Sequence, residues 1–225
     1  MQVNKQMFRK NGHPPRFKLP PHLWRLRPIQ LILIDLSDWL MGFVGINLLW
    51  VIASLTVILL PPATAAIFEA ALGAFQNQPP TTGQFFASMR RWFALSWLIT
   101  LANLLILGGL FLLGRLVYPN EIPLAMLAVA AGCFVWIQFF FWPFLLLQTR
   151  PSPFQALRNS AFTIMGDLPY FTGYLALVIL IAIPSVIVIA PMLLITPVLI
   201  ALINTYSLGI WLQRQGILTT EARES

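Results

Sequence analysis

An almost unbroken apolar stretch from Trp39 to Leu212 is the feature that most constrains this chain. Charged residues make up 9% of the sequence, against roughly 25% in an average soluble domain, and most of them lie outside this stretch. A chain with so few charges and so many leucine, isoleucine and phenylalanine residues uses lipid as the solvent for its surface. The sequence therefore predicts an all-α integral membrane protein.

The apolar stretch divides into segments of the length that a transmembrane helix needs, which is about 20 residues. Residues 39–60, 92–117, 122–147, 168–190 and 191–212 each reach this length. One more segment, residues 62–76, would be roughly 22 Å long as a helix, at about 1.5 Å per residue. This length suits either a short, tilted crossing or a re-entrant helix.

The basic residues decide between five and six crossings, because Lys and Arg gather on the cytoplasmic side of a membrane. If residues 62–76 do not cross, six arginines lie outside the cell: Arg90, Arg91, Arg150, Arg158, Arg214 and Arg223. If they do cross, all of the 14 basic residues except Arg115 are cytoplasmic. We therefore predict a bundle of about six transmembrane helices, the second short or re-entrant, in the cell membrane with both termini cytoplasmic.

The charges also divide the chain into three parts. Residues 1–28 form a basic cytoplasmic arm, residues 29–217 a polytopic membrane domain, and residues 218–225 a short cytoplasmic tail. The arm contains half of all basic residues and is expected to contact anionic lipids. Nucleic acid is not an expected partner, because no nucleic-acid-binding fold accompanies the arm.

Two further segments have one apolar and one polar face and are predicted to lie as amphipathic helices at the membrane interface. The first begins at Thr81 and the second at Ser152, and each precedes a long apolar segment. In the second, Phe154, Leu157 and Ala161 form the apolar face.

Residues 62–76 have a small-residue face and a large apolar face. The small face is predicted to pack closely on neighbouring helices, as small residues do in membranes; it includes Ala66, Ala70, Gly73 and Ala74. The opposite face, with Ile67, Leu72 and Phe75, is expected to face lipid.

Glu69 is the one acid well inside a predicted span, and such a group is costly unless paired or protonated. Asn47, Gln138 and Asn204 lie at comparable depth in other spans, so a polar cluster of four residues is predicted. It has two interpretations. The cluster lines a solute or proton path, or a protonated glutamic acid hydrogen-bonds to amides and fixes the helix order. We prefer the second.

The chain contains no pattern typical of an enzyme or a metal site. Both histidines, His13 and His22, lie in the basic arm, and Cys133 is the only cysteine. No Ser/His/Asp set, HExxH motif or phosphate-binding loop occurs. We expect no catalytic residue, no metal and no cofactor.

Several short motifs carry a family resemblance. They are Asn47-Leu48-Leu49-Trp50, Pro62-Ala63-Thr64-Ala65-Ala66-Ile67-Phe68, Phe85-Phe86, Arg90-Arg91-Trp92-Phe93 and Leu157-Arg158-Asn159-Ser160-Ala161. Over roughly residues 40–216 the chain resembles the YesL-like family of bacterial membrane proteins. It departs from the family at Leu72-Gly73, where members often have a basic pair. The resemblance implies a small polytopic protein of unestablished activity, often associated with carbohydrate uptake, and implies no site residue.

These observations lead to one preferred function and two alternatives. The preferred function is a non-catalytic accessory or component of a solute-uptake system, with importer permease subunits or a second copy of the chain as partners. The first alternative is a small stand-alone transporter or channel with a polar path near Glu69. A membrane-embedded enzyme is the third hypothesis.

Overall fold

A computed structural model describes residues 21–188 and 194–218, and all the elements in these ranges are helices, which confirms the all-α prediction. Most of the predicted basic arm and all but one residue of the C-terminal tail lie outside the described residues. The elements are η2 (Pro21–Leu26), α1 (Arg27–Ser54), α2 (Leu60–Phe75), α3 (Thr82–Val117), α4 (Glu121–Gln138), α5 (Phe141–Leu147), α6 (Pro153–Gly166), α7 (Leu168–Val188) and α9 (Thr196–Arg214).

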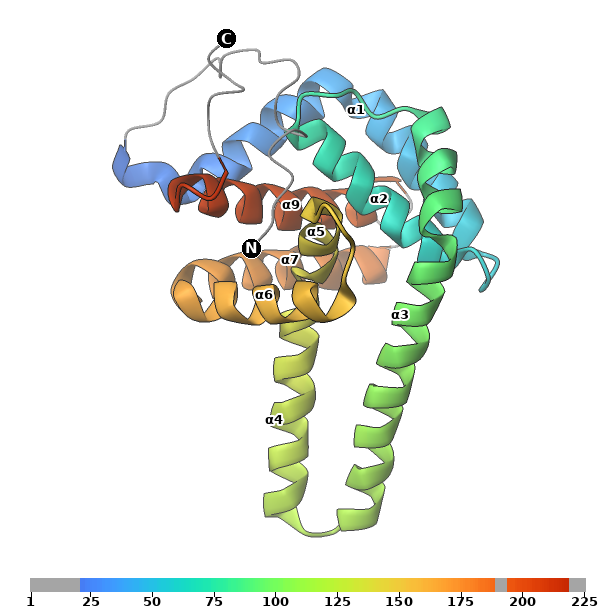
Figure 1. The fold of residues 1–225 in the computed structure, drawn as a ribbon, viewed down its shortest axis with the longest axis vertical. Helices are drawn as coiled ribbons and strands as arrows, with labels where there is room; N and C mark the ends of the chain where they lie inside the picture. Colours follow the sequence, from blue (N-terminus) through green and yellow to red (C-terminus); the bar gives the residue numbers. More distant parts are fainter. Residues whose placement is uncertain (1–20, 189–193, 219–225) are drawn as a thin grey trace.

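The helices form a body from which one long hairpin projects (Figure 1). The body consists of α1, α2, α5, α6, α7 and α9, and the hairpin consists of α4 and the longer part of α3. In Figure 1, α7 and α9 run across the direction of the hairpin. The structure is therefore a set of crossed helices rather than a bundle of parallel ones.

In the described part of the chain, four helical stretches are long and apolar enough to cross a membrane, one of them formed by α4 and α5 together. They cover Trp24–Ser54, Thr82–Val117, Glu121–Leu147 and Leu168–Val188. This is consistent with a membrane protein. Helix α2 has 16 residues and is shorter, and α9 is not in the set.

Helix α9 forms the centre of the body. Every residue from 201 to 212 is buried, although the run includes the polar residues Asn204, Thr205 and Ser207. The helix contacts α1, α2, α5 and α7. Gly209 allows α2 to approach closely, because the Phe75 ring lies where a β-carbon at position 209 would be. The most polar of the long helices is thus enclosed by the protein itself.

Helix α1 begins at Arg27, twelve positions before the predicted start at Trp39. Trp39 itself has a non-helical backbone conformation (φ −126°, ψ 26°), so the helix is kinked where the predicted span begins. Contacts of the preceding η2 hold the start of α1 in place: Trp24 stacks on Tyr170 of α7 and lies under the Arg214 guanidinium, 3.9 Å from the ring centre. Sequence alone did not indicate these contacts, because they join segments far apart in the chain.

The two predicted amphipathic helices differ from expectation. The segment beginning at Thr81 is the start of α3 and is not a separate helix, because neither glycine nor proline interrupts residues 84–107. The segment beginning at Ser152 is the separate helix α6, but its buried side chains are Ala156, Ser160, Thr163 and Ile164. Of the predicted apolar face, Phe154 is 74% exposed, whereas Leu157 is partly buried and packs against the core.

The predicted span over residues 122–147 is broken at Phe139 and Phe140, which separate α4 from α5. A helix end leaves carbonyl groups without partners, and these need hydrogen bonds inside a membrane. Ser160 of α6 donates to the Ile137 carbonyl at 2.5 Å, and Asn204 of α9 donates to the Phe139 carbonyl at 3.0 Å. Neighbouring helices thus satisfy the carbonyl groups freed by the break.

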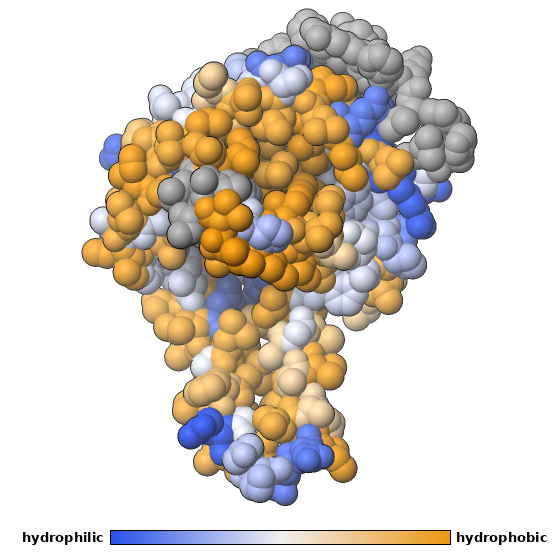
Figure 2. Space-filling model, turned by 180° about the vertical axis from the view of Figure 1, so that it is seen from behind, coloured by the Kyte–Doolittle hydropathy of each residue, from blue (hydrophilic) through white to orange (hydrophobic). Residues whose placement is uncertain are grey.

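The surface away from these contacts is strongly apolar. Figure 2 shows hydrophobic residues over much of the body and along the hairpin, with hydrophilic residues at the hairpin's free end. Leu105 and Phe111 on the hairpin are 76% and 68% exposed. Arg115 and Glu121 lie next to the turn between α3 and α4. This pattern suits a hairpin whose sides contact lipid.

Candidate functional site

The candidate site lies between α2 and the first part of α3, which a short connection joins as antiparallel neighbours. Helix α2 ends in a Schellman motif: the Gln78 N–H donates to the Gly73 carbonyl at 2.9 Å, and the Asn77 N–H donates to the Ala74 carbonyl at 2.8 Å. Asn77 adopts the left-handed conformation that this motif requires (φ 62°). Thr81 then caps α3 by accepting a hydrogen bond from the Gln84 N–H at 3.3 Å.

This connection fixes which residues of the two helices face each other. Glu69 lies eight positions before Asn77, and Arg91 lies ten positions after Thr81. At about 1.5 Å per residue, they are roughly 12 and 15 Å from the connection, so they lie at similar heights.

The structure joins Glu69 to two residues of α3. Glu69 forms an ion pair with Arg91, and its other oxygen accepts a hydrogen bond from the Trp92 Nε1–H at 2.6 Å. The Arg91 guanidinium also lies over the Trp92 ring, 5.4 Å from its centre. We call these three residues the Glu69 cluster. Glu69 is therefore neutralised by an arginine, rather than protonated and hydrogen-bonded to amides as the sequence interpretation preferred.

The Glu69 cluster lines a cleft of about 550 Å³. Residues of α2, of α3 and of the connection between α5 and α6 surround it. Its polar lining residues are Glu69, Gln76, Gln78, Gln84, Ser88, Arg91, Gln148 and Thr149. This volume lies within the range of small-molecule sites, and the concentration of amide groups is unusual for so apolar a chain.

The small face of α2 contributes to the cleft. Ala66, Ala70 and Gly73 are among the lining residues, and the Gln78 side chain is 3.9 Å from where a β-carbon at Gly73 would be. Ala74 is buried at 1% exposure. The small residues leave space that larger side chains would fill.

The large face of α2 differs from the prediction that it faces lipid. Ile67, Leu72 and Phe75 are exposed by only 3%, 6% and 4%. Helix α2 is covered on this side because α1, α3, α5 and α9 all contact it.

The hydrogen bonds described for the other predicted cluster residues run to separate partners. Asn47 accepts from the Val198 N–H at 3.3 Å and so caps the start of α9. Gln138 donates to Asn103 at 2.8 Å between the two hairpin helices. Asn204 donates to the Phe139 carbonyl at the break between α4 and α5. These three amides fix helix positions, and only Glu69 lies at the cleft.

Sequence reasoning missed Arg91 and Trp92 as partners of Glu69. It assigned the segment beginning at Thr81 to an interfacial helix and did not pair Glu69 with an arginine of that segment. The usable signal was the short connection between residues 76 and 81, which fixes the register of two antiparallel helices. It also missed Gln76 and Gln148, which lie in connections or at helix ends and show no helical pattern.

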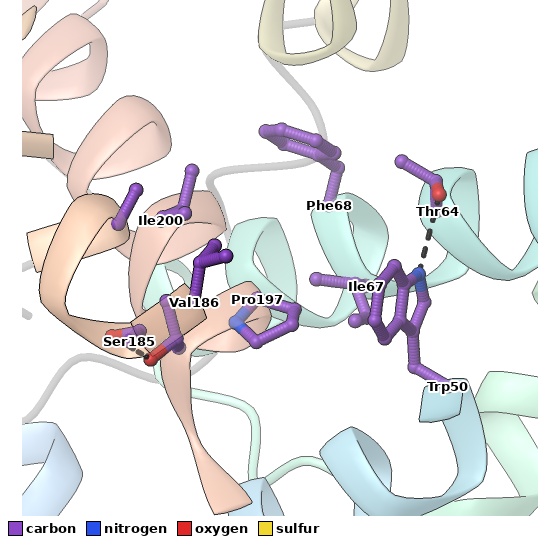
Figure 3. Close-up of a pocket in the computed structure, with 10 residues that line it drawn as sticks. Trp50, Thr64, Ile67, Phe68, Ser185, Val186, Pro197 and Ile200 are labelled. Atoms are coloured by element: carbon purple, nitrogen blue, oxygen red, sulfur yellow. Dashed lines mark hydrogen bonds between the residues drawn. The ribbon is translucent and has the colours of Figure 1, made fainter. Parts of the chain in front are cut away.

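A second cavity, of about 250 Å³, is apolar. It lies between α1 and α2 on one side and α7 and α9 on the other (Figure 3). Its polar side chains are paired with one another: Trp50 donates to Thr64 at 3.2 Å, and Thr196 donates to Ser185 at 2.8 Å. Among its described lining residues, the polar side chains are thus already hydrogen-bonded, and the rest of the lining is apolar.

Comparisons with known proteins give one match. Residues 43–113 match the sequence model of a family described as "Protein of unknown function, DUF624". The match runs from the middle of α1 into the hairpin and includes the Glu69 cluster, but covers less than half of the 225 residues. No curated protein and no solved structure matches the chain.

Within the described residues, no three histidine, cysteine or acidic side chains come together as metal ligands would. The chemistry that the cleft offers is hydrogen bonding and charge, from four glutamine amides and one paired arginine. Such a lining suits recognition of a polar ligand.

Proposed function

We propose that the chain is a YesL-like, multi-pass protein of the bacterial cell membrane and a non-catalytic component of a carbohydrate-uptake system. The family match supports the first part, because YesL-like proteins belong to the matched family. The association with carbohydrate uptake comes from the resemblance described above.

The projecting hairpin is the observation that carries the proposal of a component. None of the residues of α4, and none of α3 beyond Trp92, lines either of the two cavities described above. The hairpin flanks are apolar and exposed, at Leu105 and Phe111 for example. A hairpin that encloses no cavity offers its sides to lipid and to transmembrane helices of a partner, such as a permease subunit. Helices in membranes associate through surface packing of this kind.

The charges on the hairpin support both termini being cytoplasmic. Arg115 lies in the last turn of α3, whereas Arg90 and Arg91 lie within its first three turns, where Arg91 pairs with Glu69 of α2. Under the positive-inside rule, the free end with its single arginine is then outside the cell and the body end inside. The six-crossing count further requires that α2 crosses, and that α7 and α9 cross although they run across the direction of the hairpin.

Single cysteines test this orientation. In a Cys133→Ser background, we expect Asn120→Cys to react with a membrane-impermeant thiol reagent on intact cells. Gln78→Cys should react only after permeabilisation. The reverse pattern would refute the proposed orientation, and labelling of both from outside would refute the six-crossing count.

Partner contact is tested with a photo-crosslinking amino acid at Phe111, with the same group at Phe162 of α6 as a matched control. These side chains have similar exposures, 68% and 66%. We expect crosslinks from Phe111 to importer permease subunits, which also co-purify in fixed ratio, and none from Phe162. Purification of the chain alone, or only with itself, would contradict the proposal.

The Glu69 cluster favours the stand-alone transporter as the second candidate, since an ionisable group at a cleft is typical of a proton or solute path. Glu69→Gln separates the two functions. A coupled path predicts loss of flux in reconstituted vesicles with the fold retained, whereas an uptake component predicts unchanged co-purification. Full activity of Glu69→Leu would rule out the path.

A further inference from the structure

The unsatisfied hydrogen-bonding groups at the cleft are donors. Gln148 is 8% exposed, and its Oε1 accepts from the Ser152 N–H at 2.7 Å. This bond occupies the amide oxygen, so Nε2 is the end left without a partner among the described residues. The Nε2 group of Gln76 is likewise buried without a partner in the described part of the chain. Native proteins rarely leave buried donors unpaired, so these two amides indicate a missing acceptor.

The charged residues at the cleft also favour a ligand that accepts hydrogen bonds. Glu69 is the one acid among the described residues that line the cleft. Arg91 and Trp92 already bind both of its oxygens. The ion pair uses Nη2 of Arg91, whose side chain is 59% exposed, so the guanidinium is also accessible from outside the pair. An accessible arginine beside an acid whose two oxygens are already bound favours a negatively charged ligand over a cation.

The rim of the cleft is basic. Arg150 is exposed and lies between Thr149 and Pro151, which both line the cleft. Neither connection at the cleft, residues 76–81 or residues 148–152, contains an acidic residue. Anions are therefore attracted to the opening rather than repelled from it.

We propose that this cleft binds an oxyanion, that is, a phosphate or carboxylate group, with Gln76, Gln148 and Arg91 as its hydrogen-bond donors. Amide and guanidinium N–H groups suit oxyanions, because hydrogen bonds to charged acceptors are the strong ones. The oxyanion belongs either to a soluble solute or to the headgroup of an anionic phospholipid. The inference does not depend on the proposed function, since the cleft binds its ligand with or without a permease partner.

The test uses the full-length protein in nanodiscs of phosphatidylcholine, with the midpoint of thermal unfolding as readout. A ligand that binds only the folded state raises this midpoint as its concentration increases. Inorganic phosphate, glycerol 3-phosphate and succinate are the soluble probes, with glycerol as the neutral control. Nanodiscs that also contain phosphatidylglycerol represent the lipid source.

Gln148→Glu is the main variant, because it keeps the oxygen that accepts from Ser152 and replaces the free donor with a charged acceptor. Gln76→Glu is the second variant, in case the first does not fold. Arg91→Lys keeps the charge but removes the planar group of donors. Gln215→Glu is the matched control, since Gln215 is exposed at the end of α9 and does not line the cleft.

We expect the dissociation constant of the anion to rise by about tenfold or more in each cleft variant, from loss of a hydrogen bond to a charged group. Gln215→Glu should leave it unchanged. Stabilisation by the soluble anions in phosphatidylcholine identifies a solute site. Stabilisation only by phosphatidylglycerol identifies a lipid site if the cleft variants lose it, since binding of this lipid to the basic arm would persist in them. Equal stabilisation by glycerol, or unchanged anion binding in the folded cleft variants, would overturn the proposal.

Discussion

Gly209 offers the sharpest test of the packing between α2 and α9. A β-carbon at this position would lie 2.4, 2.7 and 2.9 Å from three carbons of the Phe75 ring. Carbon atoms in contact are normally about 3.5–4.0 Å apart, so Gly209→Ala requires a shift of about 1 Å. The ring has little freedom to move, because Phe75 is 4% exposed and packs edge-on against Tyr206, with ring centres 5.1 Å apart.

The expected magnitude combines two opposing effects. Overpacking a filled core costs about 1–3 kcal/mol, whereas alanine gains about 1 kcal/mol over glycine inside a helix. Gly173→Ala on α7 measures the second effect alone, since a β-carbon there meets nothing within 4 Å. We therefore expect Gly209→Ala to lower the free energy of unfolding by about 1–3 kcal/mol relative to Gly173→Ala.

The assay is unfolding in mixed micelles by increasing fractions of a denaturing detergent, followed by far-UV circular dichroism. Phe75→Leu provides the compensating change, because a smaller side chain opposite position 209 removes the clash. In a double-mutant cycle, the pair Phe75→Leu and Gly209→Ala should be less destabilised than the sum of the single changes. Equal stabilities of Gly209→Ala and Gly173→Ala would refute the packing argument.

Three further predictions concern the polar contacts and the hairpin. Asn204→Leu should lower the free energy of unfolding by about 1–3 kcal/mol, because it leaves the partly buried Phe139 carbonyl without its donor. The same micelle titration measures this, and an unchanged midpoint would contradict it. Gln138→Leu should cost only about 0.6 kcal/mol, the average for hydrogen bonds between transmembrane helices, because polar side chains also find partners in the unfolded, membrane-inserted state. A loss as large as that of Asn204→Leu would place this pair in the protein core instead. Cys133 is exposed on α4, so a water-soluble maleimide should fail to modify it in intact vesicles and react once detergent replaces the lipid. Reaction in vesicles, measured by a mass shift, would show that the middle of the hairpin contacts water.

The residues that line the cleft lie partly inside and partly outside the region that the family model matches. Glu69, Arg91 and Trp92 all lie within the matched residues 43–113, whereas Gln148 and the α5–α6 connection lie outside them. The cleft thus joins a part of the chain that the family model covers to a part that it does not. Variants on each side of the cleft, such as Gln76→Glu and Gln148→Glu, test whether both parts are needed for binding.

The class of the protein and the type of its elements follow from the sequence alone. Apolar segments of membrane length, separated by prolines and short polar connections, predict helices, and the structure contains helices where those segments lie. Composition determines the class, because whether a protein surface suits lipid or water depends on its total apolar area. It does not depend on which residues contact each other in the fold. The short length of α2 was equally visible, since residues 62–76 are bounded by proline and polar residues.

Only the tertiary structure decided which helix is central and which residues meet at the cleft. Helix α9 is buried throughout its polar run from Asn204 to Ser207, because neighbouring helices enclose this run. They also provide hydrogen-bond partners for part of it, as the Phe139 carbonyl does for Asn204. The pairing of Glu69 with Arg91 and Trp92 depends on the register set by the Schellman motif at Asn77. Burial and pairing depend on which two helix faces contact each other. Helical periodicity shows which residues share one face of a helix, but it does not show which other helix packs against that face.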